Sequence, residues 1–162
     1  MFDPTNWTGF HTWLSLIAIA TGIVVVYDLI GGRDRPMVTA LFLGTAAATS
    51  LTGFGFPFNT VLPSHIVGVV ALVVLAATFP ARYLLNYAGP WRLVYVVGVV
   101  ISLYLLVFVG VAQAFVKIPV LQASAPTQSE PPFAIAQLVV LALFVAIGFA
   151  AIRGGRTALR PA

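Results

Sequence analysis

Long apolar runs separated by short polar segments dominate the pattern of this chain. A helix needs about 20 apolar residues to cross the hydrocarbon core of a bilayer, and runs of that length are typical of transmembrane helices. The pattern predicts five such helices, at about residues 10–30, 37–56, 63–85, 92–116 and 133–153. We therefore expect an all-α integral membrane protein, a five-transmembrane-helix bundle that forms a single domain over residues 1–162.

Prolines mark the ends of several runs. Pro36, Pro63 and Pro90 stand where runs begin, as proline does in the first turn of a helix. Pro80 allows two interpretations. It either ends the third helix and leaves residues 81–89 at the membrane interface, or it kinks a helix that continues.

The composition supports a membrane location and excludes several kinds of chemistry. Hydrophobic residues make up 60% of the chain and charged residues 7%, whereas roughly a quarter of the residues of a soluble domain are charged. The absence of cysteine excludes disulfides, thiolate metal sites and cysteine nucleophiles. No nucleophile elbow, phosphate-binding glycine motif or zinc-protease motif is present, so the sequence assigns no enzymatic activity.

Basic residues are distributed unequally between the connections. All seven arginines lie in GGRDRP, in the connection between the third and fourth runs, and in the tail after residue 152, whereas Lys117 lies in the last external connection. With five spans, the three arginine-containing segments share one side of the membrane. The positive-inside rule then predicts an external amino terminus and a cytoplasmic carboxy terminus, so the basic character requires no nucleic-acid partner.

Two histidines occupy similar positions in the predicted topology. His11 and His65 lie in the first turns of the first and third helices, both on the external side and at nearly equal depth. The dipole at a helix amino terminus disfavours a further positive charge and favours neutral imidazole, which is the form that binds metals. The sequence therefore predicts a shallow external site around these two residues.

Several occupants of this site fit the residue types. His11 and His65 could bind the iron of a b-type haem as axial ligands, with Lys117 available to a haem propionate. Alternatively, His11, His65 and Glu130, with or without Asp3, could bind a non-haem metal ion. The histidines could also contact an anion or small solute, or lie at the interface and bond only to water and loop carbonyls.

Two acidic residues suggest structural roles. Glu130 precedes the fifth run, where a carboxylate would complement the helix dipole and cap free N–H groups, although the external connection 117–133 could also be a lid or a docking surface. Asp28 lies near the inner end of the first run, and we expect it to pair with Arg33, Arg35 or Arg92.

Three stretches carry a resemblance to other proteins. LQASAPTQSEPPFAIAQ, LTGFGFP and LPSHIVG are similar to a group of small bacterial multi-pass membrane proteins, over most of the chain after residue 45. The group has no assigned activity, so the resemblance implies a bacterial inner-membrane location and transfers no functional residue. The two helix-borne histidines also resemble those of b-type cytochromes in ligand type alone.

Three classes of function remain open from the sequence. The first is binding of haem b or a related redox cofactor, with a role in electron transport. The second is a non-catalytic accessory subunit of a membrane complex, and the third is a transporter or channel for a small neutral solute. Small residues at a spacing of four in the second run, such as Gly44 with Ala48, favour close helix packing in a homo-oligomer or a larger complex within the lipid bilayer.

Overall fold

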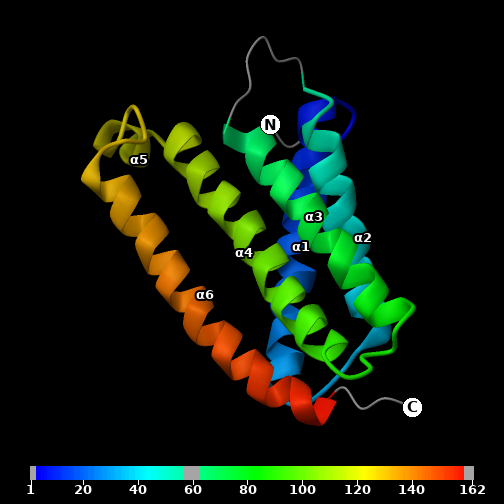
Figure 1. The fold of residues 1–162 in the computed structure, drawn as a ribbon. Helices are drawn as coiled ribbons and strands as arrows, with labels where there is room; N and C mark the ends of the chain where they lie inside the picture. The colour runs from blue at the N-terminus through cyan, green and yellow to red at the C-terminus, as the bar shows by residue number, and fades with distance from the viewer. Residues whose placement is uncertain (1–2, 57–62, 159–162) are drawn as a thin grey trace.

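The computed structural model describes residues 3–56 and 63–158, and all regular secondary structure in these residues is helical. The helices are α1 (Trp7–Ile30), α2 (Pro36–Gly53), α3 (Pro63–Tyr83), α4 (Trp91–Lys117), α5 (Pro119–Ser124) and α6 (Pro131–Ala158). The all-helical fold class predicted from the apolar runs is confirmed for these residues. Figure 1 shows the helices as one bundle, in which α1 begins and α6 ends at opposite ends.

Four of the helices are long and apolar enough to cross a membrane: α1, α3, α4 and α6. The prediction of membrane-spanning helices therefore stands for four of the five runs. The helix α2 fills the place of the second run but is not among the four. It has 18 residues, and its small and hydroxyl side chains, which include Thr45, Thr49 and Ser50, lower its mean hydropathy.

The helix boundaries have local causes. The side chain of Asn6 caps α1 by accepting a hydrogen bond of 2.8 Å from the N–H of Gly9, so α1 begins at Trp7, earlier than expected. Pro36 and Pro63 occupy the first positions of α2 and α3, as predicted. Pro80 lies inside α3, which continues to Tyr83. Of the two interpretations of Pro80, the continuing helix is therefore correct.

The first four helices form a ring, in which each packs on the next and α4 also packs on α1. The helix α6 lies outside this ring against α1 and α4, and the short α5 connects it to the end of α4 (Figure 1). The sequence analysis did not predict α5. Its six residues are too few to form the long apolar run that identifies a span.

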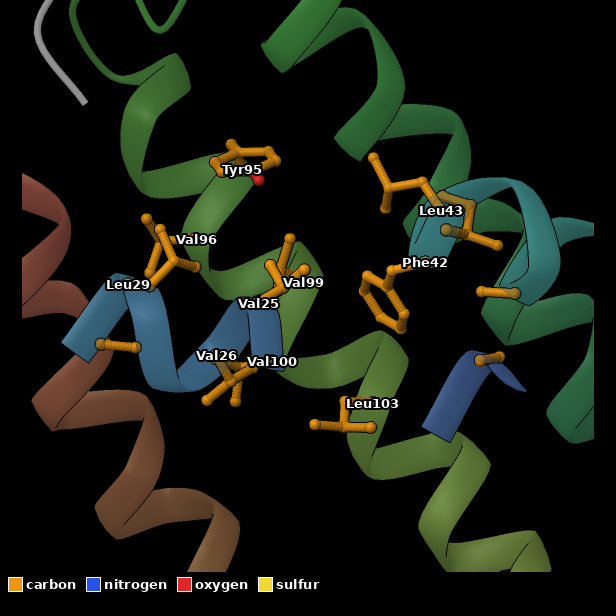
Figure 2. Close-up of a cluster of buried hydrophobic side chains, with 14 of the residues drawn as sticks. Val25, Val26, Leu29, Phe42, Leu43, Tyr95, Val96, Val99, Val100 and Leu103 are labelled. Atoms are coloured by element: carbon orange, nitrogen blue, oxygen red, sulfur yellow. The ribbon is translucent and has the colours of Figure 1, made fainter. Parts of the chain in front are cut away.

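The core lies between α1, α2 and α4. Its side chains include Val25, Leu29, Phe42, Val99 and Leu103, which Figure 2 shows converging from three helices. Phe42 reaches α1 because Gly22 lacks a side chain: a Cβ at Gly22 would lie 2.7 Å from the Phe42 ring.

None of the described atoms lies within 4 Å of a Cβ built at Gly44, so this glycine is open within the chain, and its close packing in an oligomer or larger complex stays a prediction. The nearest approaches between helices occur at other glycines. A Cβ at Gly98 on α4 would collide with Thr78 on α3. A Cβ at Gly154 on α6 would collide with the backbone carbonyls of Leu29 and Ile30 on α1.

Candidate functional site

Polar residues gather at the two ends of the bundle. We call one the histidine end, because it contains His11 near the start of α1 and His65 near the start of α3. We call the other the arginine end, because it contains the arginines at residues 33, 35, 82, 92 and 156. The candidate site predicted from the sequence lies at the histidine end.

The imidazole of His11 is half-buried against the end of α2. Its Nδ1 lies 2.9 Å from the hydroxyl oxygen of Thr52, and its ring meets the ring of Phe56 edge-on at a centroid distance of 5.2 Å. Gly53 lies beside it, since a Cβ there would be 3.7 Å from Cε1 of His11. These contacts hold the ring on the last turn of α2.

The hydrogen-bond chain through Thr52 assigns the tautomer of His11. The Thr52 hydroxyl donates its proton to the backbone carbonyl of Ala48 at 2.7 Å, so its oxygen is left to accept a hydrogen bond from His11. This arrangement favours the tautomer in which Nδ1 of His11 carries the proton. In this tautomer Nε2 keeps its lone pair, so it can bind a metal or accept a proton.

His65 contacts the same end of α2 from another helix. Its ring stacks on the ring of Phe54 with a centroid distance of 5.9 Å and an interplanar angle of 24°. Gly68, one turn later in α3, lets Phe54 approach, because a Cβ there would lie 3.2 Å from that ring. Residues 52–56 thus receive His11 from α1 and His65 from α3. The structure brings both predicted ligands to one short segment.

Lys117 and Glu130 lie at the same end of the bundle, near α5. Lys117 is the last residue of α4, which packs on α1, the helix that carries His11. Among the described residues, no three histidine or acidic side chains are gathered so as to hold a metal ion. The set of His11, His65 and Glu130 is therefore not assembled as a metal centre in this structure.

The carboxylate of Glu130 stabilises the turn that precedes α6. It accepts hydrogen bonds from the N–H and hydroxyl of Thr127 and from the N–H of Ser129, at 2.8–3.3 Å. Burial raises the pKa of Glu130, but these hydrogen bonds outweigh it and the net pKa is lowered. The first two residues of α6 are prolines without N–H groups, which explains why the carboxylate binds N–H groups of the turn rather than capping the helix.

At the arginine end, Asp28 is almost fully buried and pairs with two arginines, as expected. Its Oδ1 lies 3.2 Å from Nε of Arg33, and its Oδ2 lies 3.0 Å from Nε of Arg35 in a direction that does not make a hydrogen bond. The turn at the end of α1 positions these groups. Gly32 has a φ of +68°, and the N–H of Arg33 returns to the carbonyl of Asp28 at 2.8 Å, which is a Schellman motif.

A second and more deeply buried cluster joins the α1–α2 connection to α3 and α4. Arg82 is 5% exposed and contacts both carboxylate oxygens of Asp34 at 3.1 and 3.2 Å. It also donates a hydrogen bond of 3.0 Å to the hydroxyl of Tyr95. Its guanidinium lies within 5.7 Å of the ring centroids of Tyr83, Tyr87 and Tyr95. Burial raises the pKa of Tyr87 more than the charge of Arg82 lowers it.

Sequence reasoning missed this Asp34–Arg82 cluster. It placed Arg82 in the connection between the third and fourth runs and assigned it no acidic partner. The sequence did contain a signal for this cluster. Asp34 is one of four acids in the chain and stands between two arginines in the sequence, and three tyrosines occur within 13 residues of Arg82. Comparison with protein-family models, curated proteins and solved structures found no match to this chain.

Proposed function

We propose that this protein spans a bacterial inner membrane five times, with the amino terminus outside and the carboxy terminus in the cytoplasm. Two observations support α2 as the fifth span. It packs between α1 and α3, both of which are apolar enough to span (Figure 1). Its 18 residues extend about 27 Å, close to the hydrocarbon thickness of roughly 30 Å. The arginines at one end of the bundle then mark the cytoplasmic side.

We further propose that the histidine end binds haem b or a related redox cofactor through His11 and His65. The observation that carries this proposal is the hydrogen-bond chain from Ala48 through Thr52 to Nδ1 of His11, which favours the tautomer with a free lone pair on Nε2. Ligating histidines in metalloproteins are generally held in this way, with the other ring nitrogen donating to a fixed acceptor. The stacking of His65 on Phe54 brings the second imidazole to the same segment.

The neighbouring residues suit a planar, apolar and negatively charged cofactor. Phe54 and Phe56 supply aromatic surface beside the two imidazoles. Lys117, at the same end of the bundle, supplies a positive charge for a propionate. Bound haem would supply one-electron chemistry at the external face of the membrane. The protein would orient it, exclude water on the α2 side, and hold the proton on Nδ1 of His11.

An absorption spectrum of the purified protein, oxidised and reduced, tests the proposal directly. We expect a Soret band and reduced-state visible bands, and we expect their loss in His11→Ala and in His65→Ala. The double variant should lose little more than either single variant, because each ligand loss already disables the shared site. A colourless protein that stays colourless after haem is supplied would contradict the proposal and favour an accessory subunit or a neutral-solute pathway.

Thr52→Val provides a more specific test, since it keeps the shape of the side chain and removes the acceptor for Nδ1. We expect haem affinity to fall by roughly 10-fold to 100-fold, as for other groups that orient a ligand. Thr45→Val is the matched control, because Thr45 makes the same 2.7 Å hydrogen bond to a backbone carbonyl of α2, that of Leu41. Equal haem content in both variants would show that the hydrogen bond between His11 and Thr52 does not support haem binding.

A further inference from the structure

A small cavity at the arginine end lies between the beginning of α4 and the end of α6. Its volume is about 150 Å³, and it is lined by Gly89, Arg92, Leu93, Val96, Ile152 and Arg156. The two arginines come from different helices. Two arginine side chains therefore border one partly enclosed space next to apolar side chains.

Neither arginine has a carboxylate partner among the residues that the structure describes. The chain contains four acids. Asp28 pairs with Arg33 and Arg35, and Asp34 pairs with Arg82. The remaining acids, at residues 3 and 130, bind hydroxyl and N–H groups near the amino terminus and in the turn before α6. Two like charges that face one cavity repel each other, and an anion between them would remove this repulsion.

An apolar groove continues from this cavity along α4 and α6. It has a volume of about 250 Å³ and is lined almost entirely by apolar atoms, including those of Val100, Phe144, Gly148 and the ring of Tyr104. Ile152 lines both the cavity and the groove, so the two spaces adjoin. Two arginines line the cavity at the arginine end, whereas the residues that line the groove towards the middle of the bundle are all uncharged.

We propose that the cavity and the groove together bind one anionic phospholipid of the phosphatidylglycerol type. The phosphate would lie between Arg92 and Arg156, since guanidinium groups match the geometry of phosphate oxygens. One acyl chain would follow the groove between α4 and α6. Basic pockets between transmembrane helices on the cytoplasmic side commonly receive such headgroups. This site goes beyond the proposed function, because it lies at the opposite end of the bundle from the histidines.

Thermal stability in a neutral detergent, with a short-chain lipid added, tests the headgroup part of the site. Dioctanoyl phosphatidylglycerol should raise the Tm of the full chain in a saturable way, because a ligand that binds the folded state stabilises it. Dioctanoyl phosphatidylcholine and inorganic phosphate should raise it much less at the same concentration. Arg92→Ala and Arg156→Ala should each weaken the apparent phosphatidylglycerol affinity by roughly tenfold.

Arg153→Ala is the matched control for these variants. Arg153 lies on α6 near Arg156 and is exposed, but it does not line the cavity. We expect this variant to bind phosphatidylglycerol as the unchanged protein does. An equal loss in Arg153→Ala and Arg156→Ala would show general charge attraction and overturn the site. An equal response to inorganic phosphate would reduce it to a simple anion site and overturn the lipid assignment.

Gly148→Leu tests the acyl-chain part. A Cβ at Gly148 would lie 3.8 Å from Val100, an ordinary contact, so the backbone tolerates a side chain and leucine would extend into the groove. We expect it to weaken phosphatidylglycerol binding, whereas Gly44→Leu on the open face of α2 should not. Unchanged affinity in Gly148→Leu, or no response of the unchanged protein to phosphatidylglycerol, would overturn the proposal. The haem spectrum is independent of either outcome.

Discussion

At the scale of single residues, the buried charged groups among the described residues are Asp28 and Arg82, both at the arginine end, and the partly buried Asp34 pairs with Arg82. Arg82 forms an ion pair with one carboxylate, donates a hydrogen bond to a tyrosine hydroxyl and lies beside three aromatic rings. Such a group is costly to bury unless its partners are complete. The cluster therefore makes the position of the α1–α2 connection depend on α3 and α4.

We predict that Arg82→Ala lowers the free energy of unfolding by about 3 kcal/mol, because it leaves the charge of Asp34 without its partner. Asp34→Ala should have a similar effect, and the double variant should lose clearly less than the sum of the two. Thermal or chemical unfolding in detergent measures all three. Arg153→Ala, which removes an exposed arginine, should change stability by no more than about 0.5 kcal/mol. Additive losses in the double variant would show that the two side chains act separately.

Glu130 predicts a local dependence on pH. Its pKa in the folded protein lies below the ordinary value of 4.5, so its carboxylate stabilises the turn at residues 126–130 above that pH. This contribution is lost as the pH falls below 4.5 and through the folded pKa. Hydrogen-exchange protection of the Thr127 and Ser129 amides should decrease in that range. In Glu130→Gln the protection should be lower and should not change with pH; a pH dependence retained in this variant would contradict the assignment.

At the scale of elements, helix positions could be predicted because each depends on a long local signal. Five apolar runs located α1, α2, α3, α4 and α6, and prolines located two of the helix starts. The Asp28 pairing could be predicted for the same reason, since its partners lie within seven residues. The Asp34–Arg82 pair joins residues that are 48 apart in the chain, and only the packing of α3 on α2 and α4 brings them together.

At the histidine site, too, the features that depend on helix packing could not be predicted from the sequence. The placement of His11 and His65 at the same end of the bundle could be predicted from the positions of their helices in the chain. Their contacts with residues 52–56 could not be predicted, because these depend on how the end of α2 packs between two other helices. The tautomer of His11 could not be predicted either, because it depends on the hydroxyl of Thr52, which bonds to a carbonyl of its own helix.

The contact of α6 with α1 gives a prediction at this scale. Gly154 lies against the backbone of Leu29 and Ile30, which cannot move away as a side chain could. Gly154→Ala should therefore separate the two helices and cost about 1–3 kcal/mol of stability. Gly148→Ala, whose Cβ would make an ordinary 3.8 Å contact, is the matched control. Spin labels on α1 and α6 should report a longer distance in Gly154→Ala and an unchanged one in the control.

At the scale of the whole molecule, the bundle is held differently at its two ends. At the arginine end, ion pairs join the α1–α2 connection to α1 and α3, and a hydrogen bond from Arg82 reaches α4. At the histidine end, a hydrogen bond and aromatic contacts join α1 and α3 to the end of α2 and the residues after it. The proposed orientation places the ion-paired end in the cytoplasm.

Reporter fusions at both termini test the proposed orientation and the number of spans. With five spans, a periplasmic reporter should be active at the amino terminus and a cytoplasmic reporter at the carboxy terminus. A fusion in the α1–α2 connection should report the cytoplasm. If both termini report the same side, α2 does not cross the membrane, and the histidines and the arginines cannot be assigned to opposite faces in the way proposed.

The pairing of Asp34 with Arg82 also bears on how the protein is made. Asp28 has partners five and seven residues later, so it can be neutralised as soon as α1 has left the ribosome. Asp34 must wait until α3 has been synthesised and has packed on α2. A chain that stops before residue 82 thus retains an unpaired carboxylate beside the membrane. The ion pair therefore forms only in a chain whose ring of helices is complete. Incomplete chains lack this stabilisation, so they would be more susceptible to membrane proteases.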